Sequence, residues 1–110
     1  MTTVRVWSVT TTTPTEAEAK SLARALVAEK LAASAEIAGP STSVFWHLNE
    51  LGEGLEWRVT FRTSDRVRDR LAARVSVLHQ WESPEVTAAR VEWCVDSYAA
   101  WVDRVTTDSP

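Results

Sequence analysis

One short stretch of this 110-residue sequence gathers an imidazole and two carboxylates. It runs from His79 to Glu85 with Glu82 between them, so the three titratable side chains follow at intervals of three residues. Imidazole and carboxylates together form a ligand set for divalent ions, and the nitrogen favours transition metals such as copper and zinc. Pro84 prevents a continuous helix from placing all three on one face. The stretch therefore predicts a loop-borne metal site made of His79, Glu82 and Glu85.

A structural interpretation of the same stretch competes with this one. In it, His79 ends the preceding helix and interacts with the helix dipole. Glu82 and Glu85 then pair with arginines of the same or another subunit. The sequence by itself leaves both interpretations open.

Other chemical signals in the sequence are weak. It holds no glycine-rich phosphate loop, no serine-elbow motif, no paired cysteines and no HExxH. His47 is expected to be an ordinary strand residue. The arginines at positions 66, 70 and 74 are expected to form a solvated helix face, with anion binding as the alternative. Cys94, the one cysteine, cannot form a disulfide within the chain.

Composition excludes several classes of protein. With 45% hydrophobic residues, 25% charged residues and a formal net charge of −3, the chain is expected to form one globular domain over residues 1–110. The acidic balance argues against nucleic acid or an anionic membrane as partner. No stretch approaches the roughly 20 apolar residues of a membrane span. Without a secretory signal or cysteine pairs, we expect a cytoplasmic protein.

Hydrophobic periodicity predicts the order strand, helix, strand, strand, helix, strand, helix. Thr13 is expected to cap the first helix, with Pro14 at its first position and Glu16 completing a capping box. A turn at residues 51–54 is expected to join two strands into a hairpin. The expected elements cover residues 4–9, 13–31, 33–40, 43–48 with 55–63, 64–79, 86–93 and 96–105.

This order predicts an α+β, ferredoxin-like βαββαβ fold with an additional C-terminal helix. Its helices cover one face of an antiparallel sheet and leave the other bare. Because aromatic residues stand on both sides of the expected strands, we expect the bare face to pack against another subunit. The six tryptophans favour the same conclusion, since indoles are enriched in interface cores. An aromatic-rich core is the alternative.

Several segments, in order, resemble the CutA family of divalent-cation tolerance proteins. The most specific is His79-Gln80-Trp81-Glu82-Ser83-Pro84-Glu85-Val86, which is similar to the family pattern HxYExPEI. The other matching segments are residues 9–12 with the helix at 16–27, the strands at 30–37, 43–46 and 56–63, and the YxxWL-like helix at 98–102. Together they span nearly the whole chain.

The resemblance implies a compact homotrimer, a role in divalent metal (copper) tolerance and structural similarity to PII signalling proteins. We expect no catalysis and no obligatory cofactor. A divalent ion, copper or zinc, or a small ligand is expected to bind weakly in clefts between subunits. His79, Glu82 and Glu85 are the expected metal ligands, and the expected cleft residues beside them are Glu36, Trp46, Arg62 and Trp81.

Departures from the family pattern concern the ligands. Ser34 replaces the strand cysteine of the family, so a soft thiolate ligand for copper(I) is absent there. Trp81 stands where the pattern has tyrosine, which removes a phenol, and Gln80 replaces a proline. Three alternative functions stay open at this point: a PII-like trimeric sensor of an anionic metabolite, a small cofactor-free enzyme with His47 or His79 as base, and a purely structural trimer.

Overall fold

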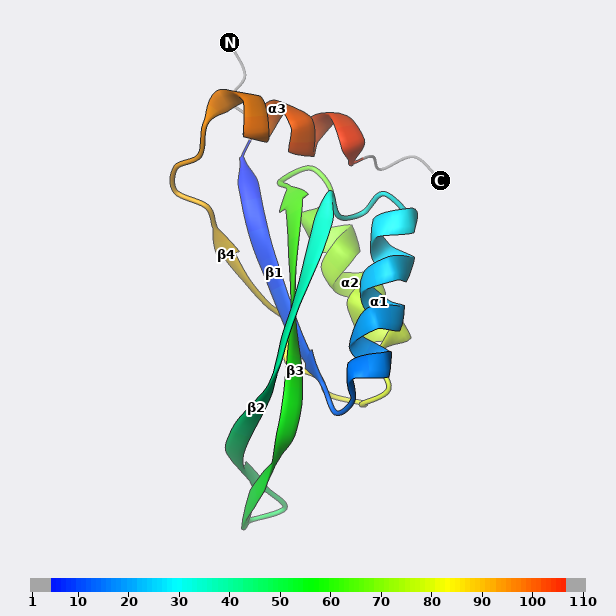
Figure 1. Cartoon of the computed structure of the whole chain (residues 1–110), viewed down its shortest axis with the longest axis vertical. Coiled ribbons are helices and arrows are strands. Elements are labelled where there is room, and N and C mark those ends of the chain that lie inside the picture. Colours follow the sequence, from blue (N-terminus) through cyan, green and yellow to red (C-terminus); the bar gives the residue numbers. More distant parts are fainter. Residues whose placement is uncertain (1–4, 107–110) are drawn as a thin grey trace.

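A computed structural model describes residues 5–106 and contains the expected order of elements (Figure 1). The four strands form one antiparallel sheet in the order β2-β3-β1-β4. This topology confirms the predicted ferredoxin-like α+β fold with its added C-terminal helix. The elements are β1 (Val6–Thr13), α1 (Glu16–Ala28), β2 (Ser34–His47), β3 (Glu50–Ser64), α2 (Arg68–Leu78), β4 (Thr87–Arg90) and α3 (Asp96–Val105).

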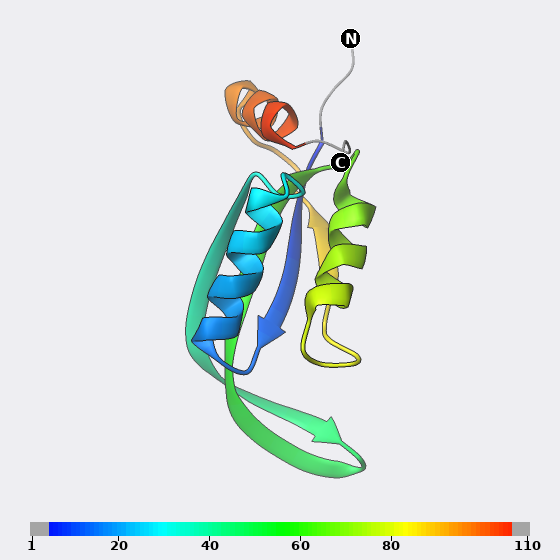
Figure 2. The same cartoon turned by 90° about the vertical axis from the view of Figure 1, so that its right-hand side faces the viewer.

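Helices α1 and α2 lie side by side on one face of the sheet (Figure 2). Their apolar positions meet the inward side of β1 and β3, where alternate side chains of a strand point to the same face. The fully buried side chains between helices and sheet include Val9, Leu26, Val59, Phe61, Val67, Leu71 and Val75. A buried hydrogen bond also joins β3 to the segment that follows α1, because the Thr63 hydroxyl donates to the Leu31 carbonyl at 2.7 Å.

The start of α1 differs from the prediction by two residues. Thr15, not Thr13, is the N-cap, and its side chain accepts from the Glu18 backbone N–H at 3.2 Å. Thr13 instead donates its hydroxyl to the Thr15 carbonyl at 2.8 Å. Both threonines precede an acidic residue by three positions, so the capping-box spacing alone does not choose between them.

Two predicted runs, 33–40 and 43–48, form the single strand β2. The pairing with β3 shifts register between Ala38 and Ser41, around the cis Gly39–Pro40 peptide, and then continues to the end of the strand. The predicted turn at 51–54 is wrong: these residues belong to β3, and the chain reverses at Leu48 and Asn49. Both have positive φ, as a two-residue type I′ hairpin turn requires.

The second half of the chain also has different boundaries. The predicted helix at 64–79 is shorter, because β3 continues to Ser64 and α2 begins only at Arg68. The predicted strand at 86–93 is reduced to Thr87–Arg90. The C-terminal helix occupies the predicted residues 96–105.

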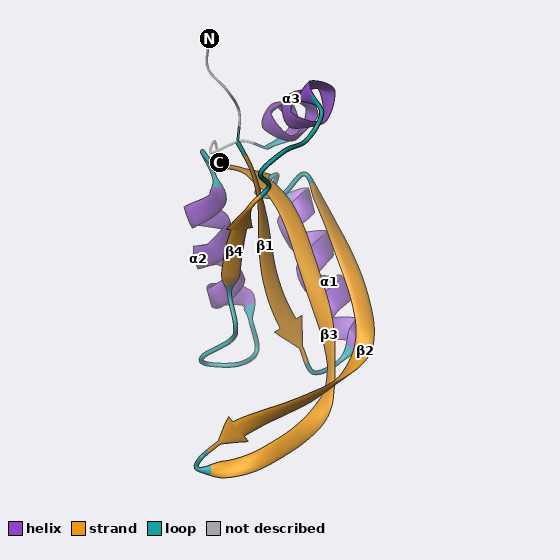
Figure 3. Ribbon diagram, turned by 90° about the vertical axis from the view of Figure 1, so that its left-hand side faces the viewer, coloured by secondary structure: helices purple, strands orange, loops and turns teal. Residues whose placement is uncertain are grey.

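The open face of the sheet is polar, which corrects the expectation of aromatic side chains on both faces. Since Val9, Val59 and Phe61 point into the core, their neighbours along the strands point the opposite way. In Figure 3, α1 and α2 lie behind the sheet as seen from this face. The residues at the open positions of β1 and β3 include Ser8, Thr10, Thr60 and Arg62.

Helix α3 lies across one end of the sheet (Figure 1). Its C-cap residue Thr106 shares a buried hydrogen bond of 3.0 Å with the Ser64 hydroxyl. At the surface, Arg66 donates to the Asp103 carboxylate at 2.7 Å. The helix is thereby fixed to the end of β3 and to the loop that follows it.

The opposite end of the sheet is extended by a hairpin arm, defined here as residues 41–56 of β2 and β3. It projects from the body of the protein (Figures 1 and 3). The whole molecule, arm included, measures 51 × 28 × 21 Å along its principal axes. Large apolar side chains stand exposed along it, among them Val44, Trp46, Leu48, Leu51 and Leu55. None of the six tryptophans is fully buried within the described chain, and Trp46 is 77% exposed.

Thr63→Val is expected to destabilise the protein. The substitution keeps the side-chain shape and removes the donor to the Leu31 carbonyl in a buried site. The free energy of unfolding should fall by about 1–3 kcal/mol. Urea unfolding at fixed protein concentration measures the change. The matched control is Thr10→Val on the open face, expected within about 0.5 kcal/mol of the parent.

Candidate functional site

The segment 79–86 forms a loop that leaves α2 and returns to the sheet as β4. His79 is the C-cap of α2, and its backbone N–H donates to the Val75 carbonyl at 2.9 Å. This agrees with the structural interpretation, in which His79 ends the helix. The predicted metal residues thus lie on an ordered loop beside the end of β1 rather than on a helix.

Both ring nitrogens of His79 are engaged in hydrogen bonds. Nε2 lies 2.7 Å from the carbonyl oxygen of Thr12, and Nδ1 accepts the backbone N–H of Trp81 at 3.0 Å. Because a carbonyl only accepts, Nε2 must carry the proton, and the ring is the neutral tautomer with its lone pair on Nδ1. That lone pair is already occupied. The imidazole therefore ties the loop to the end of β1, and either nitrogen must give up a hydrogen bond before it can bind a metal.

Two further contacts hold the loop in place. The Trp81 ring lies beside the His79 ring, with 5.3 Å between the ring centroids. With its amide nitrogen turned toward α1, Gln80 donates to the Glu18 carboxylate. Gln80 thus contributes a contact between the loop and α1.

A pocket of about 210 Å³ lies between α1 and this loop. Glu18 and Ser21 of α1 contribute polar groups, and the loop contributes His79 and Gln80. The full lining is Thr13, Glu18, Ser21, Leu22, Ala25, Leu78, His79 and Gln80.

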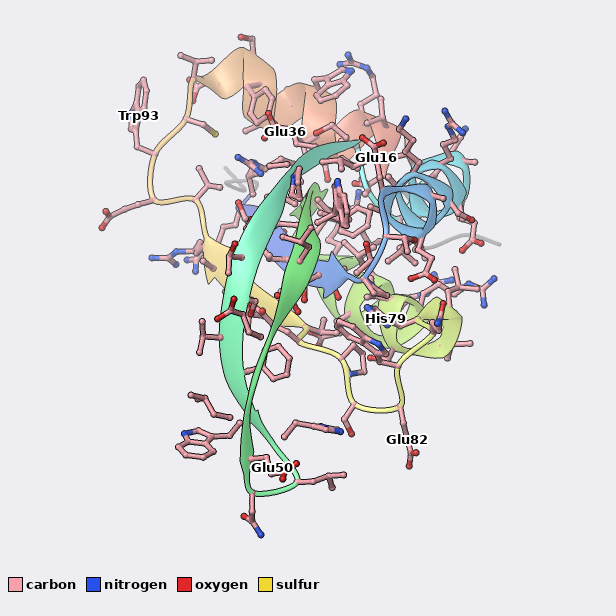
Figure 4. All side chains as sticks on the ribbon, turned by 60° about the horizontal axis from the view of Figure 1, so that its bottom comes forward. Glu16, Glu36, Glu50, His79, Glu82 and Trp93 are labelled. Atoms are coloured by element: carbon pink, nitrogen blue, oxygen red, sulfur yellow. The ribbon has the colours of Figure 1, made fainter. Side chains whose placement is uncertain are left out.

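The two predicted carboxylate ligands do not approach His79. Figure 4 shows the Glu82 side chain directed away from His79 and from the body of the protein. Glu85 lies 3.6 Å from Arg58 of β3 and also accepts the Thr87 hydroxyl at 3.2 Å. The arginine pairing expected in the structural interpretation is therefore present for Glu85. Across residues 5–106, no three side chains of His, Cys, Asp or Glu come together as a metal-binding group.

The predicted cleft residues lie in three separate places on one chain. Glu36 and Arg62 both belong to the open face of the sheet, on neighbouring strands. Trp46 pairs with Leu51 near the tip of the hairpin arm. Trp81 lies in the loop after α2. A cleft that contains all of them needs more than one copy of the chain.

The remaining candidates are placed at the surface. His47 lies exposed beside the hairpin turn, and Cys94 is half-buried in the segment before α3. In the predicted arginine series at positions 66, 70 and 74, Arg74 donates to Glu29 at 2.9 Å. This hydrogen bond holds the pKa of the Glu29 carboxyl below its usual value.

Two features of the site were not predicted. The partner of His79 is the backbone carbonyl of Thr12, far away in the chain, and a carbonyl has no residue-type signal. Arg62 has a terminal nitrogen, Nη1, that is buried without a hydrogen-bond partner among the described residues. Position 62 could be assigned to the open face by strand alternation, but its burial depends on the tertiary structure.

Comparisons with known proteins identify the family. The family model "CutA1 divalent ion tolerance protein" matches residues 7–105. A divalent-cation tolerance protein CutA of Thermus thermophilus is 32% identical over 83% of this chain and 88% of its own length. The crystal structure of CutA1 from Oryza sativa has a TM-score of 0.92 at 29% identity, covering 99% of this chain and 100% of that one. The chain belongs to the CutA1 divalent ion tolerance family.

The relatives differ in length. The chloroplastic protein CutA 1 of Oryza sativa is 30% identical over 98% of this chain, but the chain spans only 61% of that relative. Within residues 5–106, no helix is long and apolar enough to cross a membrane.

His79→Ala is expected to release the loop. Without the imidazole, the Trp81 amide loses its acceptor and the loop loses its bond to the Thr12 carbonyl. Hydrogen exchange at the Trp81 amide should accelerate about tenfold or more, while exchange in the sheet core changes little.

The matched control for this measurement is Ser83→Ala in the same loop, which should leave Trp81 exchange unchanged. Equal exchange rates at Trp81 in the parent and in His79→Ala would contradict the assigned role of His79.

Proposed function

We propose that this protein is a homotrimeric CutA protein that takes part in divalent metal (copper) tolerance and binds a metal ion or small ligand weakly between subunits. Membership of the CutA1 family carries the proposal. The distribution of exposed apolar side chains supports its assembly, and the engaged imidazole of His79 supports the weakness of binding.

Assembly is supported by apolar surface that one chain leaves in water. Trp46, Leu48 and Leu51 are each more than two-thirds exposed on the hairpin arm, and Trp93, before α3, is 79% exposed. Apolar patches of this kind are typical of interaction sites. The sheet also ends in two different edge strands, β2 and β4. An association of unlike edges is heterologous, and such contacts give a closed ring, such as a trimer, when the rotation between neighbouring copies closes.

The hydrogen bonds of His79 support the proposal that any metal binding is weak. To bind Nδ1, a metal ion must displace the Trp81 N–H. To bind Nε2, it must displace the proton that Nε2 donates to the Thr12 carbonyl. Glu85 is likewise shared with Arg58, and only Glu82 is exposed without a partner among the described residues. Ligands must therefore be released from existing partners, which lowers affinity, and further donors must come from a neighbouring copy.

A catalytic role forms no part of this proposal. A general base needs a free lone pair within reach of its substrate, whereas the Nδ1 lone pair of His79 is used by Trp81. The relatives and solved structures that this chain resembles are CutA proteins, which favours a role in metal tolerance over a PII-like sensor of an anionic metabolite.

Trp46→Glu is expected to prevent assembly, because a carboxylate in a desolvated apolar contact is costly. Light scattering coupled to size exclusion should give three times the 12.2 kDa chain mass for the parent and a smaller mass for the variant. Val77→Glu, at an exposed apolar position on α2 away from the arm, should keep the parent mass. A parent protein that stays monomeric at micromolar concentration would refute the assembly.

His79→Ala and Glu82→Gln are each expected to weaken the binding of Cu²⁺ or Zn²⁺ by about tenfold in calorimetry. Asp69→Asn, an exposed carboxylate on α2, serves as the control and should bind like the parent. Equal heats in the parent and in His79→Ala would exclude the loop as the metal site. Because the oligomeric mass is measured separately, this outcome would leave the assembly standing.

A further inference from the structure

We propose that the pocket between α1 and the loop at 79–86 binds a small primary alkylammonium ion. The charged nitrogen lies at Glu18, and the aliphatic chain packs toward Leu22, Ala25 and Leu78. The site lies within one chain and does not depend on metal binding.

The pocket lies on the helix side of the sheet. One wall is α1, and the other is the loop that leaves α2 at His79 (Figures 2 and 4). Neither the open face of the sheet nor the hairpin arm contributes a residue to the described lining. Assembly through those surfaces therefore leaves the pocket accessible.

Glu18 gives this pocket a negative charge. A glutamate is ionised at neutral pH, and Glu18 forms no ion pair within residues 5–106, where its side-chain partner is the neutral amide of Gln80. The described lining contains no lysine or arginine, and the His79 ring is in its neutral form. The pocket therefore repels an anion and attracts a cation.

Two other glutamates of this helix and its C-cap provide the contrast. Glu16 lies 3.8 Å from Lys20, and Glu29 accepts from Arg74 at 2.9 Å. Both are more exposed than Glu18, which is half-buried. Charges attract each other more strongly where less water surrounds them. Glu18 is thus the carboxylate of the three that gains most from a bound cation.

An ammonium head matches the acceptors at this end of the pocket. A carboxylate offers about four acceptor sites, so the amide of Gln80 leaves part of the capacity of Glu18 free. The Ser21 hydroxyl, one turn further along α1, forms no hydrogen bond within residues 5–106. Because an ammonium carries three donors and no acceptor, it can donate to both side chains.

The rest of the pocket suits a short aliphatic chain. Glu18, Ser21, Leu22 and Ala25 share one face of α1, because they follow at intervals of three, one and three residues. The helix rises about 10 Å over these seven steps, from the polar end to the apolar end. Leu78 at the end of α2 is 39% exposed and adds apolar surface that a chain would cover.

The size of the pocket limits the ligand. Its volume of about 210 Å³ lies below the roughly 300–1,000 Å³ of pockets that hold drug-sized molecules. A primary amine with a chain of a few methylenes is therefore the class of ligand that its charge, shape and size select.

The test measures the binding of n-butylammonium chloride to the assembled protein, with a chelator present so that no metal takes part. Calorimetry and the NMR signals of the Ser21 and Gln80 amides follow the titration, and sodium chloride at matched ionic strength is the reference. We expect saturable binding. Butyrate, which has the opposite charge, should bind at least about tenfold more weakly. Methylammonium should lose up to about fourfold in affinity for each missing methylene.

Glu18→Gln keeps the shape of the side chain, removes its charge and should weaken binding at least about tenfold. The matched control is Glu16→Gln, which makes the same change in the same helical turn but outside the pocket, and it should bind like the parent. Ala25→Leu fills the apolar end and leaves the carboxylate in place. It should weaken binding to a similar extent, and it tests the site even if Glu18→Gln does not fold.

Three outcomes would overturn the site. The first is the absence of saturable n-butylammonium binding by the parent, and the second is equal binding of butyrate. The third is unchanged affinity in both Glu18→Gln and Ala25→Leu. Since metal is removed and the oligomeric mass is measured separately, these outcomes are distinct from a failure of the proposed trimer or of its metal binding.

Discussion

The alternation of side chains along β3 is the constraint on which the rest of the structure depends. This strand lies between β1 and β2 and therefore cannot shift by one residue without exchanging its two faces. Val59 and Phe61 fill the core under the helices, and this fixes Thr60 and Arg62 on the open side. The same register sets Ser8 and Ser34 beside Arg62. Core packing thus determines which polar side chains of the strands lie together on the open face of the sheet.

The loop after α2 is held by a different kind of interaction. His79 acts as a bridge between the backbone of β1 and the backbone of its own loop, and it uses both ring nitrogens to do so. An imidazole beside carboxylates in a sequence suggests a ligand set, but backbone groups can occupy the same nitrogens. Whether such a histidine is a ligand or a structural bridge is decided by these backbone partners, which the residue types do not reveal.

The fold could be predicted from the sequence because its elements have clear periodicity. The C-terminal helix at residues 96–105 and the order of strands and helices follow from apolar spacing alone. The errors lie where local signals conflict. Gly52 and Gly54 suggested a turn, but the chain reverses at Leu48 and Asn49, because strand pairing continues past the glycines. Phe45 lies opposite Gly52, where a Cβ would meet its ring.

The site could be predicted only in part, for a related physical reason. Sequence spacing placed His79, Glu82 and Glu85 close in the chain, whereas the loop directs Glu82 outward and brings Glu85 to Arg58. Sequence patterns also overstated the aromatic character of the open face. Four of the tryptophans are half-buried around the body, and the other two, Trp46 and Trp93, are exposed outside the sheet face.

The exposed hairpin arm affects how prone a newly synthesised chain is to aggregation. Its two strands pair within one chain, so a chain that is not covered by a second molecule presents exposed apolar side chains such as Trp46 and Leu51 to its surroundings. Exposed apolar strands are the usual starting points of aggregation during biogenesis. An uncovered arm therefore makes a newly synthesised chain more prone to aggregation than its well-packed core alone would suggest.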